Sequence, residues 1–272
     1  RRCRFEADAM NRPYSTEGFA RDEYVVDGVR SVVYSAGNGP PVVYFHGGGT
    51  FHGFEWARDW LGRFRVVLPY HPGFGESADD PDITALADYV VHYEALFRAL
   101  GLSRFGLVGT SLGGRLATEF ALSHGASVDR LVLVSPAGLQ SADHPLPDFA
   151  AIAPSEIPKL LVADPAFVAR FWPSDADAAF LAARGRESVS TGRVLGDSAA
   201  ADRKLRRRLP RLATPTLILW GGQDHILPPG LAQHWAVAIA GSIVAVIDEA
   251  GHLLLDESPR ARKIAADFLA NG

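Results

Sequence analysis

Residues 105–124 read FGLVGTSLGGRLATEFALSH, and this stretch decides the fold class. A short apolar run is followed by the glycine-bounded Ser111 and then by a helical pattern over residues 112–124. This order of strand, sharp turn and helix is the context in which the G-x-S-x-G motif carries a nucleophilic serine. Glycines at 109 and 113 would let strand and helix approach, and a helix N-terminus favours an anion. We therefore predict that Ser111 is a nucleophile; the alternative is a plain helix cap.

Short apolar runs elsewhere in the chain alternate with longer amphipathic segments. Runs of four or five apolar residues closed by Gly or Pro predict strands covered on both faces. Residues 24–26 and 29–34 flank an Asp-Gly pair, which indicates a hairpin at an antiparallel edge. The other expected strands are 41–45, 65–68, 105–109, 130–134, 216–220 and 243–247, and the expected helices are 84–100, 112–124, 229–240 and 259–270. This alternation predicts an α/β fold with a mostly parallel sheet flanked by helices.

Residues 138–211 interrupt the alternation, because no strand pattern occurs there. A structureless loop of that length is implausible in a compact domain. Short helices are expected instead, over residues 155–163, 165–172, 175–183 and 198–209. We predict a helical cap (lid), residues 139–210, inserted into a core formed by residues 10–138 and 211–272. Phe171 and Trp172 are its candidates for substrate contact, the alternative being packing of cap on core. Its arginines either meet an anionic substrate or form a solvated helix face.

Composition narrows the classes of partner. The chain has 272 residues with 27 basic and 31 acidic side chains, a net charge of −4, which is too mild to favour nucleic acid or a membrane surface. Cys3 is the only cysteine, so an internal disulfide and a cysteine-based metal site are excluded. No stretch approaches the roughly 18–20 apolar residues that span a bilayer. We expect a cytoplasmic protein acting on a small molecule, with its natural start near Met10 and residues 1–9 outside the fold.

A serine nucleophile needs a base within hydrogen-bond reach, and the base needs an orienting group. His252 follows the last expected strand, and Asp224 directly follows the strand before it. Catalytic groups gather at the carboxyl ends of strands in open parallel sheets. We therefore predict His252 as general base and Asp224 as the acid that orients it. The alternative for His252 is an ordinary histidine of a surface loop, and the alternative for Asp224 is an Asx-type turn. His225 and Asp248 are the rival base and acid, and we assign them supporting roles.

The sequence HGGG at residues 46–49 follows the strand expected at 41–45. Backbone N–H groups aimed at a developing oxyanion are each worth about 3 kcal/mol in the transition state. We expect the N–H groups of Leu112 and Gly48 to form an oxyanion hole, with Gly47 as the fallback donor and a substrate contact. The alternative is a glycine-rich turn with a purely steric purpose. No metal or organic cofactor is expected.

Taken together, these motifs resemble the α/β-hydrolase superfamily, and the resemblance covers residues 24–269. It rests on HGGG at 46–49, HPGFGES at 71–77, GTSLGG at 109–114, GGQDHILP at 221–228 and GHLLLDESP at 251–259. The resemblance implies an eight-stranded sheet with a cap inserted after the sixth strand. It also implies a serine hydrolase that works through an acyl-enzyme.

Within the superfamily, the layout is similar to small esterases and to meta-cleavage-product hydrolases, which cleave carbon–carbon bonds. The latter usually carry Pro-Gly after the triple glycine and an aromatic residue after the catalytic histidine. This chain has Thr50-Phe51 and Leu253 there, so esterase activity is the first expectation. Cofactor-free haloperoxidases and perhydrolases share the serine triad and stay open. Ser111 argues against the carboxylate nucleophile of epoxide hydrolases and haloalkane dehalogenases. The remaining alternative is a non-catalytic binding protein of the same fold.

Overall fold

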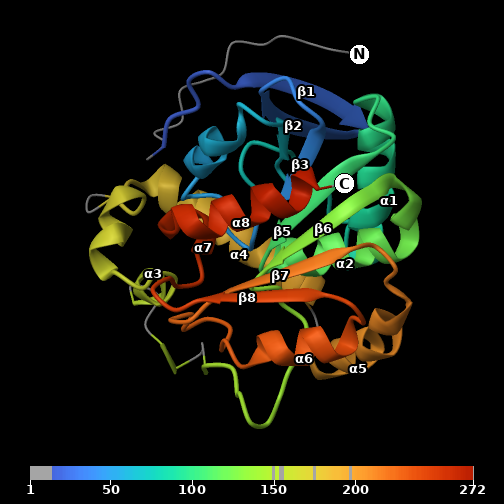
Figure 1. The fold of residues 1–272 in the computed structure, drawn as a ribbon. Helices are drawn as coiled ribbons and strands as arrows, with labels where there is room; N and C mark the ends of the chain where they lie inside the picture. The colour runs from blue at the N-terminus through green and yellow to red at the C-terminus, as the bar shows by residue number, and fades with distance from the viewer. Residues whose placement is uncertain (1–13, 149–150, 153–155, 174–175, 196–197, 272) are drawn as a thin grey trace.

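The computed structural model describes residues 14–148, 151–152, 156–173, 176–195 and 198–271. One eight-stranded sheet forms its centre, in the order β1-β2-β4-β3-β5-β6-β7-β8. β1 (Ala20–Val26) and β2 (Val29–Ala36) form the predicted antiparallel hairpin, and β2 also pairs antiparallel with β4. All other neighbours are parallel, so the predicted fold class is confirmed. In Figure 1 the blue hairpin and the orange-red β8 lie at opposite ends of the sheet.

Each strand that the apolar runs predicted is present. The bounds are β3 (Pro41–Phe45), β4 (Arg65–Pro69), β5 (Phe105–Thr110), β6 (Val128–Val134), β7 (Thr216–Gly221) and β8 (Ile243–Ile247). Successive side chains of a strand point to opposite faces. Val66 accordingly packs in the core on one face of the sheet, and Val67 packs in the core on the other.

Helices cover both faces. α1 (Leu86–Ala99), α2 (Leu112–His124) and α6 (Leu231–Ala238) contribute to the core on one face. The 3₁₀ helix η1 (Glu55–Trp60) and α8 (Pro259–Ala270) contribute to the other. Two short helices, η2 (Gly125–Ser127) and α7 (Leu254–Glu257), lie in connecting loops. No helix within the described ranges is both long enough and apolar enough to cross a membrane.

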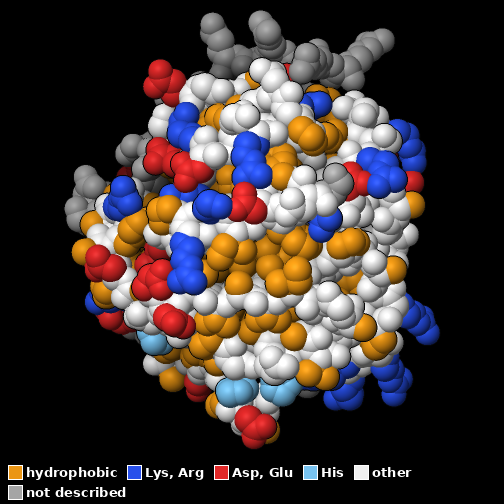
Figure 2. All heavy atoms as spheres, in the orientation of Figure 1, with side chains coloured by type: hydrophobic (Ala, Val, Ile, Leu, Met, Phe, Trp, Pro, Cys, Tyr) orange, Lys and Arg blue, Asp and Glu red, His pale blue; other side chains and the backbone are white. Residues whose placement is uncertain are grey.

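The expectation that every strand is covered on both faces is wrong for β8. Ile243 is 56% exposed and Val246 is 40% exposed. β8 is the last strand in the sheet and has a neighbour on one side only. Figure 2 shows apolar side chains gathered on this face of the molecule.

The segment between β6 and β7 has no strand among its described residues, as predicted. It contains α3 (Ile157–Leu160), η4 (Pro165–Arg170), α4 (Ala178–Leu195), α5 (Ser198–Arg208) and η5 (Leu209–Arg211). The helix predicted over 175–183 was too short, since α4 continues to Leu195. Its second half buries Glu187 and Ser190, and a polar buried face does not produce an apolar stripe in the sequence. The cap limits of 139–210 stay a prediction, and residues 1–9 lie outside the described part of the chain.

Candidate active site

Ser111 lies on the turn between β5 and α2, as the motif predicts, with φ of 55° and ψ of −117°. A non-glycine residue in such a conformation costs about 1–3 kcal/mol and persists only where its surroundings hold it. Here the Ser111 N–H donates to the carbonyl oxygen of Val134 at 3.0 Å. The Ser111 carbonyl oxygen accepts from the N–H groups of Arg115 and Ala137, at 3.1 and 3.0 Å. These three hydrogen bonds fix the strained turn at the carboxyl end of the strand.

The glycines beside Ser111 are required by close backbone contacts. A Cβ atom on Gly109 would lie 2.3 Å from the carbonyl oxygen of Gly113. A Cβ atom on Gly113 would lie 2.1 Å from the carbonyl oxygen of Phe45. The sequence-based reason for glycine at 109 and 113, close approach of strand and helix, is confirmed.

The replacement Gly113→Ala should lower the free energy of unfolding by about 3 kcal/mol or more, because the added methyl group overlaps backbone that cannot move aside. Chemical denaturation measures this change. Gly185→Ala is the matched control: Gly185 is exposed within α4 and a Cβ there meets nothing within 4 Å. That variant should be unchanged or up to about 1 kcal/mol more stable. Equal stability of the two variants would contradict the steric argument.

Asp224 and His252 meet although 28 residues separate them. Asp224 follows β7 and His252 follows β8, and Nδ1 of His252 lies 2.8 Å from Oδ2 of Asp224. The other carboxylate oxygen accepts the N–H groups of Ile226 and Leu227, at 2.9 and 2.8 Å. Both side chains are buried. Because an ionised carboxylate only accepts, Nδ1 of His252 carries the proton and Nε2 keeps a free lone pair.

Glu257 holds the loop that carries His252, and sequence reasoning gave it no role. Its carboxylate accepts the N–H groups of Gly251 and Ala163, at 2.7 and 2.8 Å. Burial raises the pKa of Glu257. Leu253 N–H donates to the carbonyl oxygen of Leu161 at 2.8 Å, so a second hydrogen bond ties this loop to the segment between β6 and β7. The only sequence signal was the place of Glu257 inside the GHLLLDESP motif.

Ser111 and His252 line one cavity of about 290 Å³. Gly47 and Gly48 belong to the same wall, and a Cβ on Gly47 would lie 3.3 Å from Cβ of Ser111. The structure therefore brings together the serine, the histidine and the HGGG loop. The other described lining residues are Gly49, Phe51, His52, Thr110, Ile157, Leu161, Thr191, Ile226 and Leu253.

The backbone N–H groups of two glycines in the cavity wall, and that of the residue after Ser111, are available to a ligand. Those of Gly47, Gly48 and Leu112 have no acceptor among the described residues. Leu112 is the first residue of α2, so its N–H stands at the positive end of the helix dipole. These are the three groups that the sequence proposed for an oxyanion hole.

Two buried histidines anchor the HGGG loop. The N–H of His71 donates to Nε2 of His46 at 3.0 Å, so His46 carries its proton on Nδ1 and donates it to the carbonyl oxygen of Gly47 at 2.7 Å. Nε2 of His71 returns a hydrogen bond to the carbonyl oxygen of His46 at 3.0 Å. Burial lowers the pKa of His71 to about 3, and burial together with the neighbouring His71 holds the pKa of His46 well below its usual value. Both rings are therefore neutral supports for the loop.

These neutral histidines should make the fold acid-sensitive. His92 joins them, because burial lowers its pKa to about 4. A histidine with a depressed native pKa binds a proton more readily when unfolded, so stability falls as pH drops from about 6.5 toward 4. At pH 5, His71 and His92 should each have lowered the free energy of unfolding by about 2 kcal/mol relative to neutral pH, and His46 should act in the same direction. Denaturation at a series of pH values should show this loss.

The matched variants for this test are His92→Gln and His225→Gln. His92→Gln should weaken the pH dependence of the free energy of unfolding by the contribution of one proton taken up on unfolding, since it removes one of the buried titrating groups. His225 is exposed, and its replacement should leave the dependence unchanged. A pH profile that is flat between 6.5 and 4 would exclude the assignment of neutral buried rings.

Phe171 and Trp172, predicted to meet substrate, are absent from the described lining of this cavity. They lie one layer behind it, with ring centroids 5.5 and 5.3 Å from that of Phe51. Phe171 also packs in a small apolar cluster with Leu253. His52, which the sequence reasoning passed over, does line the cavity, and its Nδ1 lies 3.2 Å from a carboxylate oxygen of Asp256.

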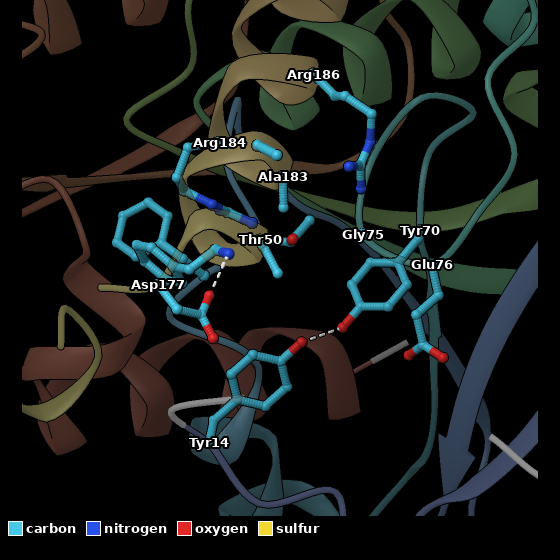
Figure 3. Close-up of a pocket in the computed structure, with 13 residues that line it drawn as sticks. Tyr14, Thr50, Tyr70, Gly75, Glu76, Asp177, Ala183, Arg184 and Arg186 are labelled. Carbon is cyan, nitrogen blue, oxygen red and sulfur yellow. Dashed lines mark hydrogen bonds between the residues drawn. The ribbon is translucent and has the colours of Figure 1, made fainter. Parts of the chain in front are cut away.

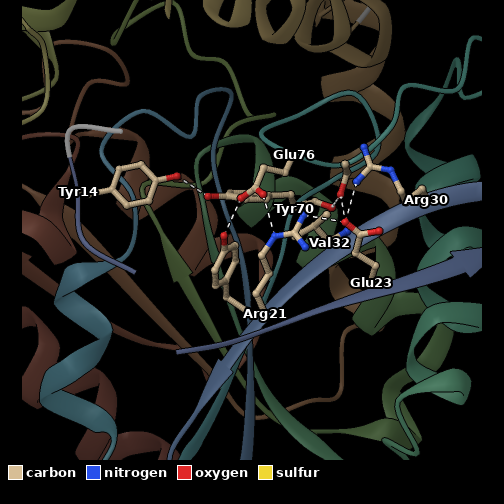
Figure 4. A network of polar contacts seen from close by, with 9 residues as sticks. Tyr14, Arg21, Glu23, Arg30, Val32, Tyr70 and Glu76 are labelled. Carbon is tan, nitrogen blue, oxygen red and sulfur yellow. Dashed lines mark hydrogen bonds and ion pairs between the residues drawn. The ribbon is translucent and has the colours of Figure 1, made fainter. Parts of the chain in front are cut away.

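Figure 3 shows a second cavity, of about 200 Å³. Phe51 lines both this cavity and the first one. Its wall includes Thr50, Gly75 and Arg184. Glu76, the residue after Gly75, belongs to a polar network that ties the loop after β4 to β1 and β2 (Figure 4). There the Glu76 carboxylate accepts the Tyr34 hydroxyl at 2.7 Å and Nε of Arg21 at 2.8 Å, and Tyr70 is hydrogen-bonded to Tyr14.

A serine on a strained turn after β5, an acid after β7 and a histidine after β8 define an arrangement of the α/β-hydrolase class. A model described as the alpha/beta hydrolase family matches residues 42–265, and the chain belongs to this family. The monoacylglycerol lipase abhd6-B of Xenopus laevis is 27% identical over 266 residues, covering 86% of this chain and 77% of the relative. The monoacylglycerol lipase ABHD6 of Bos taurus is 28% identical over 251 residues, covering 81% and 74%.

Solved structures show the same fold. A mutant of the meta-cleavage product hydrolase CumD has a TM-score of 0.77 at 21% identity, covering 92% of this chain and 98% of that one. An esterase from Exiguobacterium antarcticum has a TM-score of 0.75 at 21% identity, covering 91% and 98%. Neighbours with different chemistry are thus similarly close, and the activity has to be argued from the site.

Proposed function

We propose that this protein is a serine hydrolase of carboxylic esters, with Ser111 as nucleophile, His252 as general base and Asp224 as its orienting acid. One observation carries the proposal: His252, hydrogen-bonded to the buried Asp224, lines the same cavity as Ser111. The family supports a hydrolase, and the relatives named as lipases favour ester substrates.

The proposed cycle uses this chain's own groups only. Nε2 of His252 takes the hydroxyl proton as Oγ of Ser111 attacks the ester carbonyl carbon. The carbonyl oxygen becomes an oxyanion and accepts hydrogen bonds from the N–H groups of Gly48 and Leu112. His252 then protonates the departing alcohol oxygen, which leaves an acyl-enzyme. Water, deprotonated by the same histidine, attacks the acyl carbon. The bond between Oγ of Ser111 and the acyl carbon then breaks, Oγ takes the proton back from His252, and the acid is released.

The cavity suggests a small apolar acyl group. Its volume of about 290 Å³ is near the lower end of ordinary ligand pockets, about 300–1,000 Å³. Its apolar lining comes from Phe51, Ile157, Leu161, Ile226 and Leu253. Phe171 and Trp172 would limit its width by holding Phe51 in place. We include short-chain monoacylglycerols among the substrates because two relatives carry that activity in their names.

The test is a comparison of hydrolysis rates for p-nitrophenyl esters of increasing acyl length with cleavage of a ring-fission dienoate. The proposal expects ester turnover that falls beyond a short acyl length and an inert dienoate. Rapid dienoate cleavage with feeble ester turnover would replace it by carbon–carbon bond hydrolysis. A fluorophosphonate probe, which needs an activated serine, should label the protein at Ser111. A folded protein that neither labels nor turns over any ester would favour a binding role.

A further inference from the structure

Helix α4 carries one buried polar face that is hydrogen-bonded to loops of the core. Glu187 and Ser190 are each 2% exposed, and Thr191 lines the cavity with Ser111. The loops that they contact are the HGGG loop with the residue after it, and the loop after β4. Burying polar side chains away from solvent destabilises the fold unless each of them has a hydrogen-bond partner.

Glu187 holds two loops at once. Its carboxylate accepts the N–H of Thr50 at 3.1 Å, the hydroxyl of Thr50, and the N–H of Gly75 at 3.0 Å. Nη1 of Arg184, one turn earlier on α4, lies 2.6 Å from the same carboxylate and balances its charge. Figure 3 shows Arg184 on α4 with Thr50 and Gly75 around the second cavity. A charge-assisted set of this kind is stronger than neutral hydrogen bonds and rigid in direction.

Thr191 reaches the HGGG loop directly. Its hydroxyl donates to the carbonyl oxygen of Gly48 at 3.3 Å. A Cβ on Gly48 would lie 3.0 Å from that hydroxyl, so the loop backbone and α4 touch at this point. Ser190 adds a hydrogen bond from its hydroxyl to the carbonyl oxygen of Gly73 at 3.4 Å. The loop is thus held from one side by the histidines and from the other by α4.

We propose that α4 positions the oxyanion hole, with Thr191 and Glu187 as positioning residues that act through Gly48 and Thr50. This inference rests on the proposed function. Three consecutive glycines leave the loop backbone many conformations. An oxyanion donor is effective only when it is already aimed at the charge that develops. The N–H of Gly48 belongs to the peptide group whose carbonyl, that of Gly47, accepts a hydrogen bond from His46. Thr191 and Glu187 fix the next two peptide groups, through the carbonyl of Gly48 and the N–H of Thr50. The backbone is thus held on both sides of Gly48, and its N–H keeps one direction.

The experiment compares Thr191→Val, which keeps the shape and removes the hydroxyl, with Thr191→Ser, which restores the hydroxyl. Ser188→Ala is the matched control, because Ser188 is an exposed hydroxyl residue on the same helix. Three quantities are measured: kcat and KM for a p-nitrophenyl ester, Ki for an alkyl trifluoromethyl ketone, and hydrogen–deuterium exchange of the peptide containing residues 46–51. The ketone forms a tetrahedral adduct whose oxyanion reports the hole, whereas KM reports ground-state binding.

Thr191→Val should lower kcat about tenfold and raise Ki about tenfold, which is less than the loss of a whole donor. KM should stay within about twofold and the melting temperature within about 2 °C, since only one half-buried hydroxyl is lost. Exchange in residues 46–51 should become faster. Thr191→Ser should recover most of kcat and Ki, and Ser188→Ala should match the wild type. Glu187→Gln should accelerate the same exchange and lower kcat further.

Unchanged exchange and unchanged Ki in both Thr191→Val and Glu187→Gln would overturn the proposal. A loss of kcat that Thr191→Ser does not restore would also overturn it. The same holds for a loss of kcat that comes with a rise in KM and no change in Ki. Failure of the proposed function is a separate result. It would appear as full turnover in Ser111→Ala, and the exchange measurement would still decide whether α4 orders the loop.

Discussion

Replacing Ser111 with alanine should lower kcat for a p-nitrophenyl ester by about 10⁵-fold, because the attacking oxygen is gone while the rest of the site stays. The residual rate would come from the oxyanion donors and from binding alone. The melting temperature should stay within about 2 °C, since alanine has the same Cβ at the same strained backbone. Stopped assays with the purified variant and wild-type proteins measure the ratio of their kcat values.

Ser111→Gly separates catalysis from folding. Glycine adopts the φ of 55° without the Cβ penalty, so this variant should be as inactive as Ser111→Ala and about 1 kcal/mol more stable. Both variants should also fail to react with a fluorophosphonate. Normal turnover in either one would remove Ser111 from the nucleophile role, whatever the stability result.

Asp224→Asn should lower kcat/KM by about 10⁴-fold near neutral pH, the size known for the equivalent change in a serine protease. The geometry here gives the reason. Oδ1 of Asp224 accepts the N–H groups of Ile226 and Leu227, so the amide oxygen of asparagine takes that place. The amide N–H₂ then faces His252 and donates to Nδ1. The ring is forced to carry its proton on Nε2, where it cannot act as a base.

Asp248→Asn is the control, since Asp248 also follows a strand but is exposed. It should keep wild-type kcat/KM and wild-type stability. Steady-state kinetics and chemical denaturation of Asp224→Asn and Asp248→Asn measure these changes in kcat/KM and in stability. If Asp248→Asn lost the activity and Asp224→Asn kept it, the acid would have been assigned to the wrong strand end.

The strands and the elements that carry the site could be predicted because their signals are local. β-branched runs closed by Gly or Pro located each strand to within a few residues, and the short run that became β3 was located without error. The place of Ser111 on the sharp turn could be predicted because that turn needs glycines at fixed offsets. The meeting of Asp224 and His252 could be predicted because each directly follows a strand end, and parallel strands bring those ends to one edge.

The sequence does not show which face of a strand is covered, or which aromatic side chains of the segment between β6 and β7 reach the cavity. An apolar run looks the same whether a strand is covered on one side or two, so the exposure of Ile243 on β8 could not be foreseen. Phe171 and Trp172 were aromatic residues in the right segment, but aromatic character alone does not place a ring in the wall rather than behind Phe51.

The sequence by itself determined the α/β class, the strand order along the chain and the three residues proposed for catalysis, because periodicity and turn chemistry act between near neighbours. Only the tertiary structure decided what holds the HGGG loop. Glu187 and Thr50 lie 137 residues apart, and their hydrogen bonds leave no periodic signal in either segment. A buried carboxylate is stable there because folding brings it two backbone donors, a hydroxyl and a guanidinium at once.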